Sequence, residues 1–387
     1  MMGIKGPITV IFACWLTIAT QSFCSFKPEN IKVGDLGLIT GRNTETIKDA
    51  VIEKVVFYPQ GGTHQKSRIE RNGVLVRYPN AVATVLMCHG FMCDKVDIGF
   101  LRHLFPSGRF NVMNFDFRAH GEKRGDQYCT LGSDEAFDVL AAAQFLRNHP
   151  ELKNKPLYVY GFSMGAVAAI EAQAKVEKLA KNNAVKGDKL ATSIEAVSNI
   201  QESDAKHMNL GKDTLFDAMI LDCPFDSAEN VIKRGLDNLK LTVFGHTIYM
   251  PGRSILQKYA FHPYVQAMLR VVLKAVANMD SRDIAMRVFP VTPEKTVENI
   301  SVPCFYIHCK KDEKVSVDGI KSIYYNTNAG YKVLWITNGR THFDSYFYNP
   351  ERYAEKVQAF LEQAVTGSLQ KTKKQEIIID ADEQLLL

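Results

Sequence analysis

Several patterns are missing from this chain of 387 residues. Its eight cysteines have no spacing that matches a zinc site, which argues against a zinc-binding module. The formal net charge is +5, but no basic stripe with interleaved aromatic residues occurs, so nucleic acid is not expected as a partner. Internal repeats are absent, which argues against a repeat architecture. Beyond the first 25 residues, no segment has the length and apolar character of a transmembrane helix.

The N-terminus has the organisation of a targeting segment. Lys5 gives a positive charge, Pro7 to Ala19 form an apolar stretch, and small and polar residues follow from Thr20 to Ser25. Because the apolar stretch is too short to span a bilayer comfortably, residues 1–25 are interpreted as a signal peptide. An uncleaved signal anchor is the alternative. We expect an exported protein, periplasmic or secreted, or a membrane-anchored one if the segment is not cleaved.

Strand-like and helix-like segments alternate through the rest of the sequence. With 46% hydrophobic residues, the chain can build one large core or at most two domains. The alternation predicts an α/β fold with a mostly parallel central sheet flanked by helices. The segments with helical spacing are 133–148, 166–181 and 353–363. The strand-like runs are 50–58, 68–78, 83–89, 110–117, 156–160, 218–221, 303–308 and 333–336.

Two internal stretches and the C-terminal tail interrupt this alternation. Residues 182–214 are polar and are expected at the surface, whereas residues 227–298 lack a clear sheet strand and are predicted to form a helical cap. Within the cap, Tyr264 to Met279 has a polar residue at every fourth position and is otherwise nearly all apolar. This pattern predicts a helix that either packs inside the cap or forms a lid that lines an acyl-binding pocket or contacts lipid. The polar residues 366–387 are predicted to be a flexible tail.

The pentapeptide from Gly161 to Gly165 has the pattern G-x-S-x-G. It lies between a strand-like run and a helix-like segment, where a tight turn would push the hydroxyl of Ser163 out of the fold. The N-terminus of the helix would favour negative charge beside that hydroxyl. Because such a short pattern occurs by chance in roughly one chain in ten of this length, it predicts a nucleophile only together with partner residues.

A serine nucleophile needs a base to remove its proton and a carboxylate to orient that base. On a parallel sheet, both must come from loops at the carboxyl ends of strands. His342 follows the last predicted strand and is the histidine expected to act as the base. Asp312 follows the preceding strand and is the preferred acid, with Glu313 and Asp222 as alternatives.

Two backbone N–H groups should bind the oxyanion that forms when a serine attacks a carbonyl. One is that of Met164, the residue after the nucleophile. The other is assigned to Phe91, because Gly90 lies just after strand 83–89 and lets the backbone turn close to a substrate. His89 is expected to brace this loop.

The order serine, acid, histidine and several sequence blocks resemble the serine α/β-hydrolase superfamily. The resemblance is nearest to the branch that holds monoglyceride lipases, lysophospholipases, acyl-thioesterases and serine aminopeptidase-like esterases. It implies an α/β-hydrolase core over 26–226 and 299–365, with the cap over 227–298. The blocks that carry it are Thr84 to Gly90, Asn114 to Gly121, Tyr160 to Gly165, Asp222 to Phe225 and Pro303 to Asp312.

The chain departs from the family pattern in the loops near the triad. Cys309 stands where glycine is usual, and Arg340 and Thr341 stand where small residues often precede the histidine. These departures concern the loops, and they leave the three triad residues in place.

Together, these residues and the resemblance predict a serine hydrolase that cleaves an ester or thioester through an acyl-enzyme intermediate. A lipid-like acyl substrate is favoured because of the apolar cap. An aminopeptidase-like amidase on the same triad is the alternative, and a non-catalytic binding protein with this fold is a lesser one. No metal or organic cofactor is expected. The expected partners are a small acyl substrate and a membrane surface that the cap would contact.

Overall fold

The computed structural model describes a large part of the chain. Residues 1–49, residues 187–212 and the predicted lid helix beyond Tyr264 lie outside the described ranges. The predictions of a signal segment and of a lid helix therefore stay predictions. The described residues are 50–62, 70–122, 124, 127–186, 213–238, 240–243, 246–249, 258–259, 261–262, 264 and 286–381.

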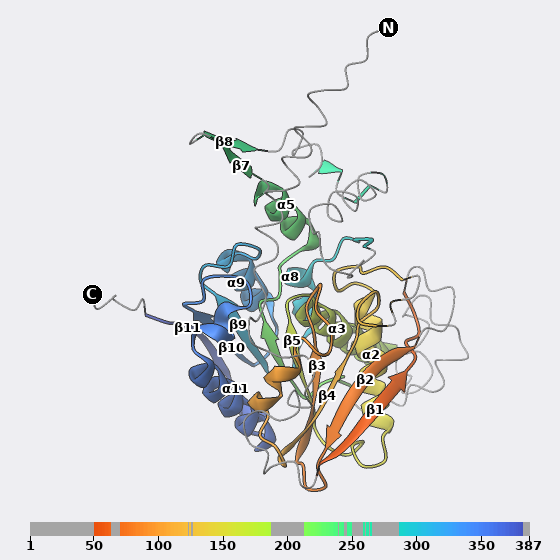
Figure 1. The fold of residues 1–387 in the computed structure, drawn as a ribbon. Coiled ribbons are helices and arrows are strands. Elements are labelled where there is room, and N and C mark those ends of the chain that lie inside the picture. The colour runs from red at the N-terminus through yellow and green to blue at the C-terminus, as the bar shows by residue number, and fades with distance from the viewer. Residues whose placement is uncertain are drawn as a thin grey trace.

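A nine-stranded sheet forms the centre of the molecule (Figure 1). Its strand order is β1-β2-β4-β3-β5-β6-β9-β10-β11, in which β2 runs antiparallel to β1 and β4 and all other neighbours are parallel. The predicted α/β fold with a mostly parallel sheet is confirmed. The strands are β1 (Val51–Phe57), β2 (Arg71–Arg77), β3 (Ala83–Cys88), β4 (Phe110–Phe115), β5 (Leu157–Phe162), β6 (Ala218–Asp222), β9 (Cys304–Cys309), β10 (Tyr331–Thr337) and β11 (Lys374–Ile379).

Helices cover both faces of the sheet (Figure 1). One face packs against α2 (Glu135–Asn148), α3 (Met164–Lys186), α8 (Pro293–Thr296), the 3₁₀-helix η4 (Val297–Asn299) and α9 (Val317–Asn326). The other face packs against the 3₁₀-helix η3 (Gly99–Leu104), α10 (Asp344–Tyr348), α11 (Pro350–Val365) and α12 (Ser368–Lys371). No helix among the described residues has the length and apolar character needed to cross a membrane.

The continuous apolar sequence of β3 follows from this double coverage. Successive side chains of a strand point to opposite faces. Leu86 and Cys88 therefore lie in the core cluster on the α3 face, whereas Val85 and Met87 lie in the cluster on the α11 face. Burial of each large aliphatic side chain stabilises the fold by roughly 1.5–3 kcal/mol. A polar residue at any of these positions would face a core and not water.

The parallel strands bring residues that are far apart in sequence to one edge of the sheet. Phe162 at the end of β5 pairs with Asp222 at the end of β6, which in turn pairs with Ile307 near the end of β9. The loops after these strand ends therefore converge, as expected for the crevice of an open α/β sheet. The residues that follow the strand ends include Gly90, Ser163, Cys223, Asp312 and His342.

The predicted cap consists in part of a helix and a small hairpin. Helix α5 (Ala228–Asn238) is followed by β7 (Lys240–Val243) and β8 (His246–Tyr249), which pair with each other and not with the central sheet. These elements project from the body at the top of Figure 1. The cap boundary at residue 298 is too late, because Val288, Val291 and Val297 are buried in the main core. The apolar residues of 286–298 thus belong to the body of the fold.

The prediction of a flexible tail over 366–387 is wrong for its first part. Residues 368–371 form α12, and residues 374–379 form β11, which pairs in parallel with β10. Polar composition does not exclude a strand at this position. An edge strand pairs with a neighbour on one side only and needs only one buried face. Within β11, the sequence Glu376-Ile377-Ile378-Ile379 supplies the β-branched residues that suit such a strand.

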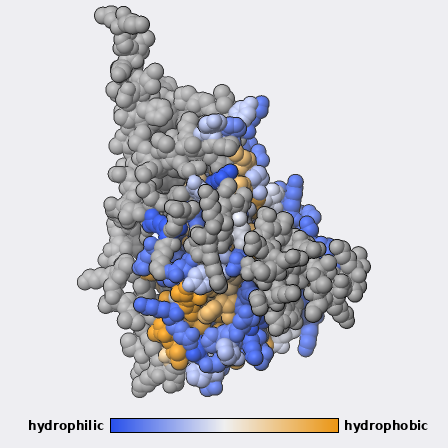
Figure 2. All heavy atoms as spheres, turned by 90° about the vertical axis from the view of Figure 1, so that its right-hand side faces the viewer, coloured by the Kyte–Doolittle hydropathy of each residue, from blue (hydrophilic) through white to orange (hydrophobic). Residues whose placement is uncertain are grey.

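The opposite edge of the sheet exposes apolar side chains. In β1, Val51, Ile52 and Val56 are each more than a third exposed, whereas Val55 and Phe57 are buried. Figure 2 faces this side of the molecule and shows apolar surface low in the view, surrounded by hydrophilic residues. This edge is remote from the converging strand ends, so it does not shape the candidate site.

Candidate active site

Ser163 lies at a sharp turn between β5 and α3. Its φ angle is +50°, a left-handed conformation that non-glycine residues rarely adopt and that concentrates at functional sites. Hydrogen bonds hold the backbone in this conformation. The N–H of Ser163 donates to the carbonyl of Asp222 at 2.8 Å, and its carbonyl accepts from the N–H of Val167 at 3.1 Å. The turn therefore presents the side chain of Ser163 away from the sheet.

The two glycines of the G-x-S-x-G pattern are required by close backbone contacts. A Cβ atom at Gly165 would lie 2.3 Å from the carbonyl oxygen of Cys88 and 2.5 Å from that of His89. A Cβ atom at Gly161 would lie 2.6 Å from Cα of Ala166. Because these neighbours are backbone atoms, they cannot swing away as a flexible side chain would. The pattern thus reflects the packing of β3 against the turn.

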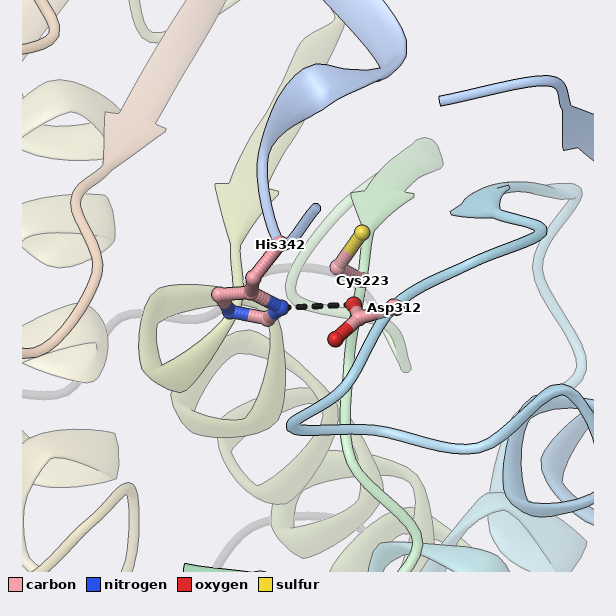
Figure 3. A group of neighbouring side chains, drawn as sticks. All are labelled: Cys223, Asp312 and His342. Atoms are coloured by element: carbon pink, nitrogen blue, oxygen red, sulfur yellow. Dashed lines mark hydrogen bonds and ion pairs between the residues drawn. The ribbon is translucent and has the colours of Figure 1, made fainter. Parts of the chain in front are cut away.

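The structure brings Ser163, His342 and Asp312 into one hydrogen-bonded chain. Nε2 of His342 lies 2.8 Å from Oγ of Ser163, and Nδ1 of His342 lies 2.6 Å from Oδ2 of Asp312. The side chain of His342 is 11% exposed and that of Asp312 is fully buried. Figure 3 shows His342 and Asp312 facing each other across the marked hydrogen bond.

The environment of Asp312 keeps its carboxylate ionised. Burial alone would raise the pKa of this carboxyl, but the attraction and hydrogen bond of His342 outweigh burial and hold the pKa at about 2. The other oxygen, Oδ1, accepts from the N–H groups of Lys314 and Val315 at 2.8 and 3.0 Å. An ionised carboxylate can only accept, so we assign the proton between the pair to Nδ1 of His342. Nε2 then has a free lone pair directed at Ser163.

The two alternative acids lie in other environments. Asp222 is buried, and its Oδ2 accepts from the hydroxyls of Tyr353 at 2.8 Å and Tyr160 at 3.4 Å. Burial raises the pKa of Asp222 to about 6 despite the hydrogen bond from Tyr353. Glu313 is exposed. Of the three candidate acids, Asp312 is the one that contacts the imidazole of His342.

The two predicted oxyanion donors lie in the expected loops. Met164 is the first residue of α3, and Phe91 follows Gly90 in the loop after β3. Neither backbone N–H donates a hydrogen bond to another described residue. A Cβ atom at Gly90 would lie 2.7 Å from the ring of Phe162, so glycine lets this loop pass close to the nucleophile turn.

Two buried histidines fix the loop that carries Phe91. Nδ1 of His89 donates to the carbonyl of Gly90 at 2.8 Å, and its Nε2 accepts from the N–H of Phe117 at 3.0 Å. The predicted bracing role of His89 agrees with these contacts. His120 was not singled out in the sequence, although it lies in the block from Asn114 to Gly121.

His120 links two strained loops. Its Nδ1 donates to the carbonyl of Arg118 at 2.7 Å, and its Nε2 accepts from the N–H of Met92 at 3.3 Å. Met92 and Ala119 both have left-handed backbone angles, with φ of 67° and 61°. Burial, together with repulsion from His89, lowers the pKa of His120 to about 3, so its Nε2 remains an acceptor at neutral pH.

The departures from the family pattern have local explanations. The thiol of Cys309 lies 3.0 Å from the hydroxyl of Ser345, at the start of α10. The backbone N–H and the Nε of Arg340 donate to Oδ2 of Asp344 at 2.7 and 3.2 Å. These contacts hold the loop on either side of His342, so larger residues are tolerated there.

A cysteine that the sequence analysis did not assign also lies at the site. Cys223 is buried, and its sulfur, a carboxylate oxygen of Asp312 and a ring nitrogen of His342 all lie within 4.8 Å of one another (Figure 3). Of the described residues, these three form the one group with metal-ligating geometry. The six cysteines in the described ranges are free thiols.

Comparisons with known proteins place this chain in a family. A sequence profile of the "Alpha/beta hydrolase family" matches residues 85–356. The chain is also 23% identical over 279 residues to the uncharacterized protein YqkD of Bacillus subtilis (strain 168), which covers 72% of this chain and 71% of that protein.

Two solved structures have a similar fold. The esterase Pf2001 of Pyrococcus furiosus has a TM-score of 0.51 and 19% identity, over 84% of this chain and 95% of that chain. The peroxisomal alpha-beta-hydrolase Lpx1 of Saccharomyces cerevisiae has a TM-score of 0.51 and 14% identity, over 88% and 94%. At such identities the likeness concerns the fold, whereas the profile match extends over most of the sequence. The chain therefore belongs to the alpha/beta hydrolase family.

Proposed function

We propose that this hydrolase cleaves carboxylic esters or thioesters with Ser163 as its nucleophile. Nε2 of His342 takes the proton from Oγ of Ser163 as the oxygen bonds to the carbonyl carbon of the substrate. Asp312 stabilises the imidazolium that forms. The N–H groups of Phe91 and Met164 bind the negative oxygen of the tetrahedral intermediate.

Collapse of this intermediate gives an acyl-enzyme. The bond to the leaving oxygen or sulfur breaks, and the imidazolium of His342 returns the proton to the leaving group. Water then attacks the acylated Ser163, with His342 again as the base, and releases the acid. This series of reaction steps requires no redox step. A leaving alkoxide or thiolate needs less assistance from a proton donor than a leaving amine does.

The observation that carries the proposal is the unbroken chain of contacts at 2.8 Å and 2.6 Å from Ser163 through His342 to Asp312. The left-handed backbone at Ser163 supports it, because strain of this kind is retained where a side chain must be presented. Family membership supports a hydrolase in general. The description of Pf2001 as an esterase agrees with the ester class.

A fluorophosphonate probe tests the nucleophile directly. The probe forms a covalent bond with an activated serine, so the wild-type protein should be labelled and Ser163→Ala should not. Ser368→Ala is a matched control, because Ser368 begins α12 and its hydroxyl is hydrogen-bonded to Gln363 and Thr366 and not to a triad residue. Equal labelling of wild type and Ser163→Ala would exclude Ser163 as the nucleophile.

The preferred acyl group is a separate question. We propose an apolar acyl chain, because the half-buried side chain of Phe91 belongs to a residue whose N–H is a proposed oxyanion donor, and because the sequence predicts an apolar cap. Turnover of p-nitrophenyl esters of increasing chain length should then rise from acetate to longer acyl groups. Faster turnover of aminoacyl amides would favour a peptidase instead, and no turnover of either class, without probe labelling, would favour a binding protein.

A further inference from the structure

Cys223 occupies a position that resembles that of Ser163 on the neighbouring strand. Each residue directly follows a parallel strand, and each has a φ angle of +50°. Each also donates its backbone N–H to the adjacent strand, Ser163 to Asp222 and Cys223 to Ile307, at 2.8 and 2.9 Å. The second turn places a thiol, and not a hydroxyl, beside the pair formed by Asp312 and His342 (Figure 3).

The three side chains offer a mixed set of donors for a metal ion. A thiolate sulfur, an imidazole nitrogen and a carboxylate oxygen are the ligands that zinc prefers, with bond lengths of about 2.0–2.3 Å. Two such ligands of one tetrahedral ion lie about 3.4–3.7 Å apart. The donors of Cys223, Asp312 and His342 already lie within 4.8 Å of one another. Nδ1 of His342 and Oδ2 of Asp312, now 2.6 Å apart, would have to separate by about 1 Å.

A second sulfur lies next to this group. The thiol of Cys309, which is also buried and free, interacts electrostatically with that of Cys223. Thiolates select zinc and its softer relatives, such as cadmium, over magnesium and calcium. The chemistry of the cluster therefore favours a thiophilic divalent cation and disfavours the hard cations.

We propose that Cys223, Asp312 and His342 form a binding site for zinc or cadmium, and that a metal ion bound there switches the hydrolase off. Metal binding itself does not depend on the proposed function, whereas the loss of activity does. The site is distinct from a catalytic metal centre. A metal ion bound there would engage the imidazole of His342, which the proposed reaction needs as its base.

The loss of activity follows from the proton balance at His342. Without metal, the proton lies on Nδ1 and the lone pair on Nε2 faces Ser163. When the ion binds Nδ1, the neutral imidazole carries its proton on Nε2 instead, and it can no longer accept the proton of Ser163. The Cys223 thiol releases one proton to solvent as the thiolate bonds to the metal, and Asp312 remains ionised. One proton is thus released for each ion bound, and no oxidation occurs.

Cadmium absorption tests the site without reference to catalysis. A cadmium–thiolate bond gives a charge-transfer band in the ultraviolet, so the full-length protein titrated with cadmium in thiol-free buffer should develop that band. Ser163→Ala should develop it equally. Cys223→Ser and Cys223→Ala should lose most of it, whereas Cys304→Ser should keep it, because Cys304 is a buried thiol at the opposite end of β9. An undiminished band in folded Cys223 variants would overturn the proposal.

Zinc inhibition tests the switch. Activity toward a p-nitrophenyl ester should fall after incubation with zinc and return when EDTA is added. Relative to its own metal-free rate, Cys223→Ser should need at least about tenfold more zinc for half-inhibition, since loss of one ligand weakens binding at least as much as loss of a supporting group. An equal zinc requirement would overturn the switch. If the wild-type protein cleaves no ester while the cadmium band depends on Cys223, the proposed function fails and the metal site stands.

Discussion

Nδ1 of His342 lies 2.6 Å from Oδ2 of Asp312, although the two residues are 30 positions apart in the chain. They meet because β9 and β10 are parallel neighbours, so that the loops after both strands leave the same edge of the sheet. Asp312 is in turn held by the backbone N–H groups of Lys314 and Val315. The acid is therefore fixed before any substrate arrives, which makes its removal informative.

Replacement of Asp312 by asparagine should abolish most of the activity without loss of the fold. The amide can donate to Nδ1, which favours the imidazole tautomer that has its proton on Nε2 and cannot act as a base. We expect kcat for a p-nitrophenyl ester to fall roughly 10³–10⁴-fold. Circular dichroism should show that the variant is folded.

Glu313→Gln is the matched control for this experiment. Glu313 is the next residue, carries the same charge and was an alternative acid in the sequence, but it is exposed. Its kcat should stay within about threefold of wild type, because a surface charge contributes little to a reaction at a buried pair. A larger loss in Glu313→Gln than in Asp312→Asn would reassign the acid.

Most of the fold and most of the candidate site could be predicted from the sequence, because both depend on local patterns. Apolar runs predicted strands β1 to β6, β9 and β10, and the position of Asp312 and His342 after consecutive strands followed from the geometry of a parallel sheet. Helix α9 was missed because its amphipathic segment is short. Strand β11 was missed because its pairing with β10 is a tertiary contact that composition does not encode.

The positions of Cys223 and His120 at the candidate site could not be predicted for a similar reason. A cysteine after a buried strand usually serves as a small hydrophobe, and its approach to His342 depends on a left-handed turn that no local pattern indicates. His120 reaches Met92 across 28 positions of sequence. In both cases, the decisive contact joins two loops whose mutual placement requires the folded sheet.

Gly165→Ala should damage both stability and the nucleophile turn. The added Cβ atom would lie 2.3 Å from the carbonyl oxygen of Cys88, so β3 and the turn must move apart. We expect the free energy of unfolding in urea to fall by about 1–3 kcal/mol, as for overpacked cores. Gly330→Ala is the control, because no atom lies within 4 Å of its Cβ position, and it should change stability by less than about 1 kcal/mol.

His120→Asn should weaken catalysis by loosening the loop that carries Phe91. The asparagine amide can still donate to the carbonyl of Arg118, but it cannot reach the N–H of Met92, which His120 holds at 3.3 Å. The fall in kcat should be smaller than the roughly 10²–10³-fold cost of removing an oxyanion donor. KM should change little. A variant in which KM rises while kcat stays unchanged would contradict a positioning role.

The same variant should make the protein less sensitive to acid. The pKa of His120 is about 3 in the folded state, below its ordinary value near 6.5, because the ring is buried. Between these values the unfolded chain binds more protons than the folded one, so stability is fully present above pH 6.5 and is lost as the pH falls toward 3. The free energy of unfolding of wild type should therefore decline over this range more steeply than that of His120→Asn. Equal slopes in urea titrations at several pH values would contradict this assignment.

Asp380 tests whether the C-terminal segment belongs to the core. Its Oδ1 accepts from Nε1 of buried Trp335 at 2.9 Å and pairs with Arg352 at 2.7 Å, while its N–H donates to the carbonyl of Ile336 at 2.9 Å. Asp380→Ala leaves the indole N–H buried without an acceptor, which should cost about 1–3 kcal/mol of unfolding free energy. Asp380→Asn keeps an acceptor oxygen and should recover most of that loss.

Deletion from Lys374 onward should cost more than either substitution, because it also uncovers the edge of β10. If the segment were a detached tail, all three changes would stay within about 0.5 kcal/mol of wild type, and the emission of Trp335 would not shift.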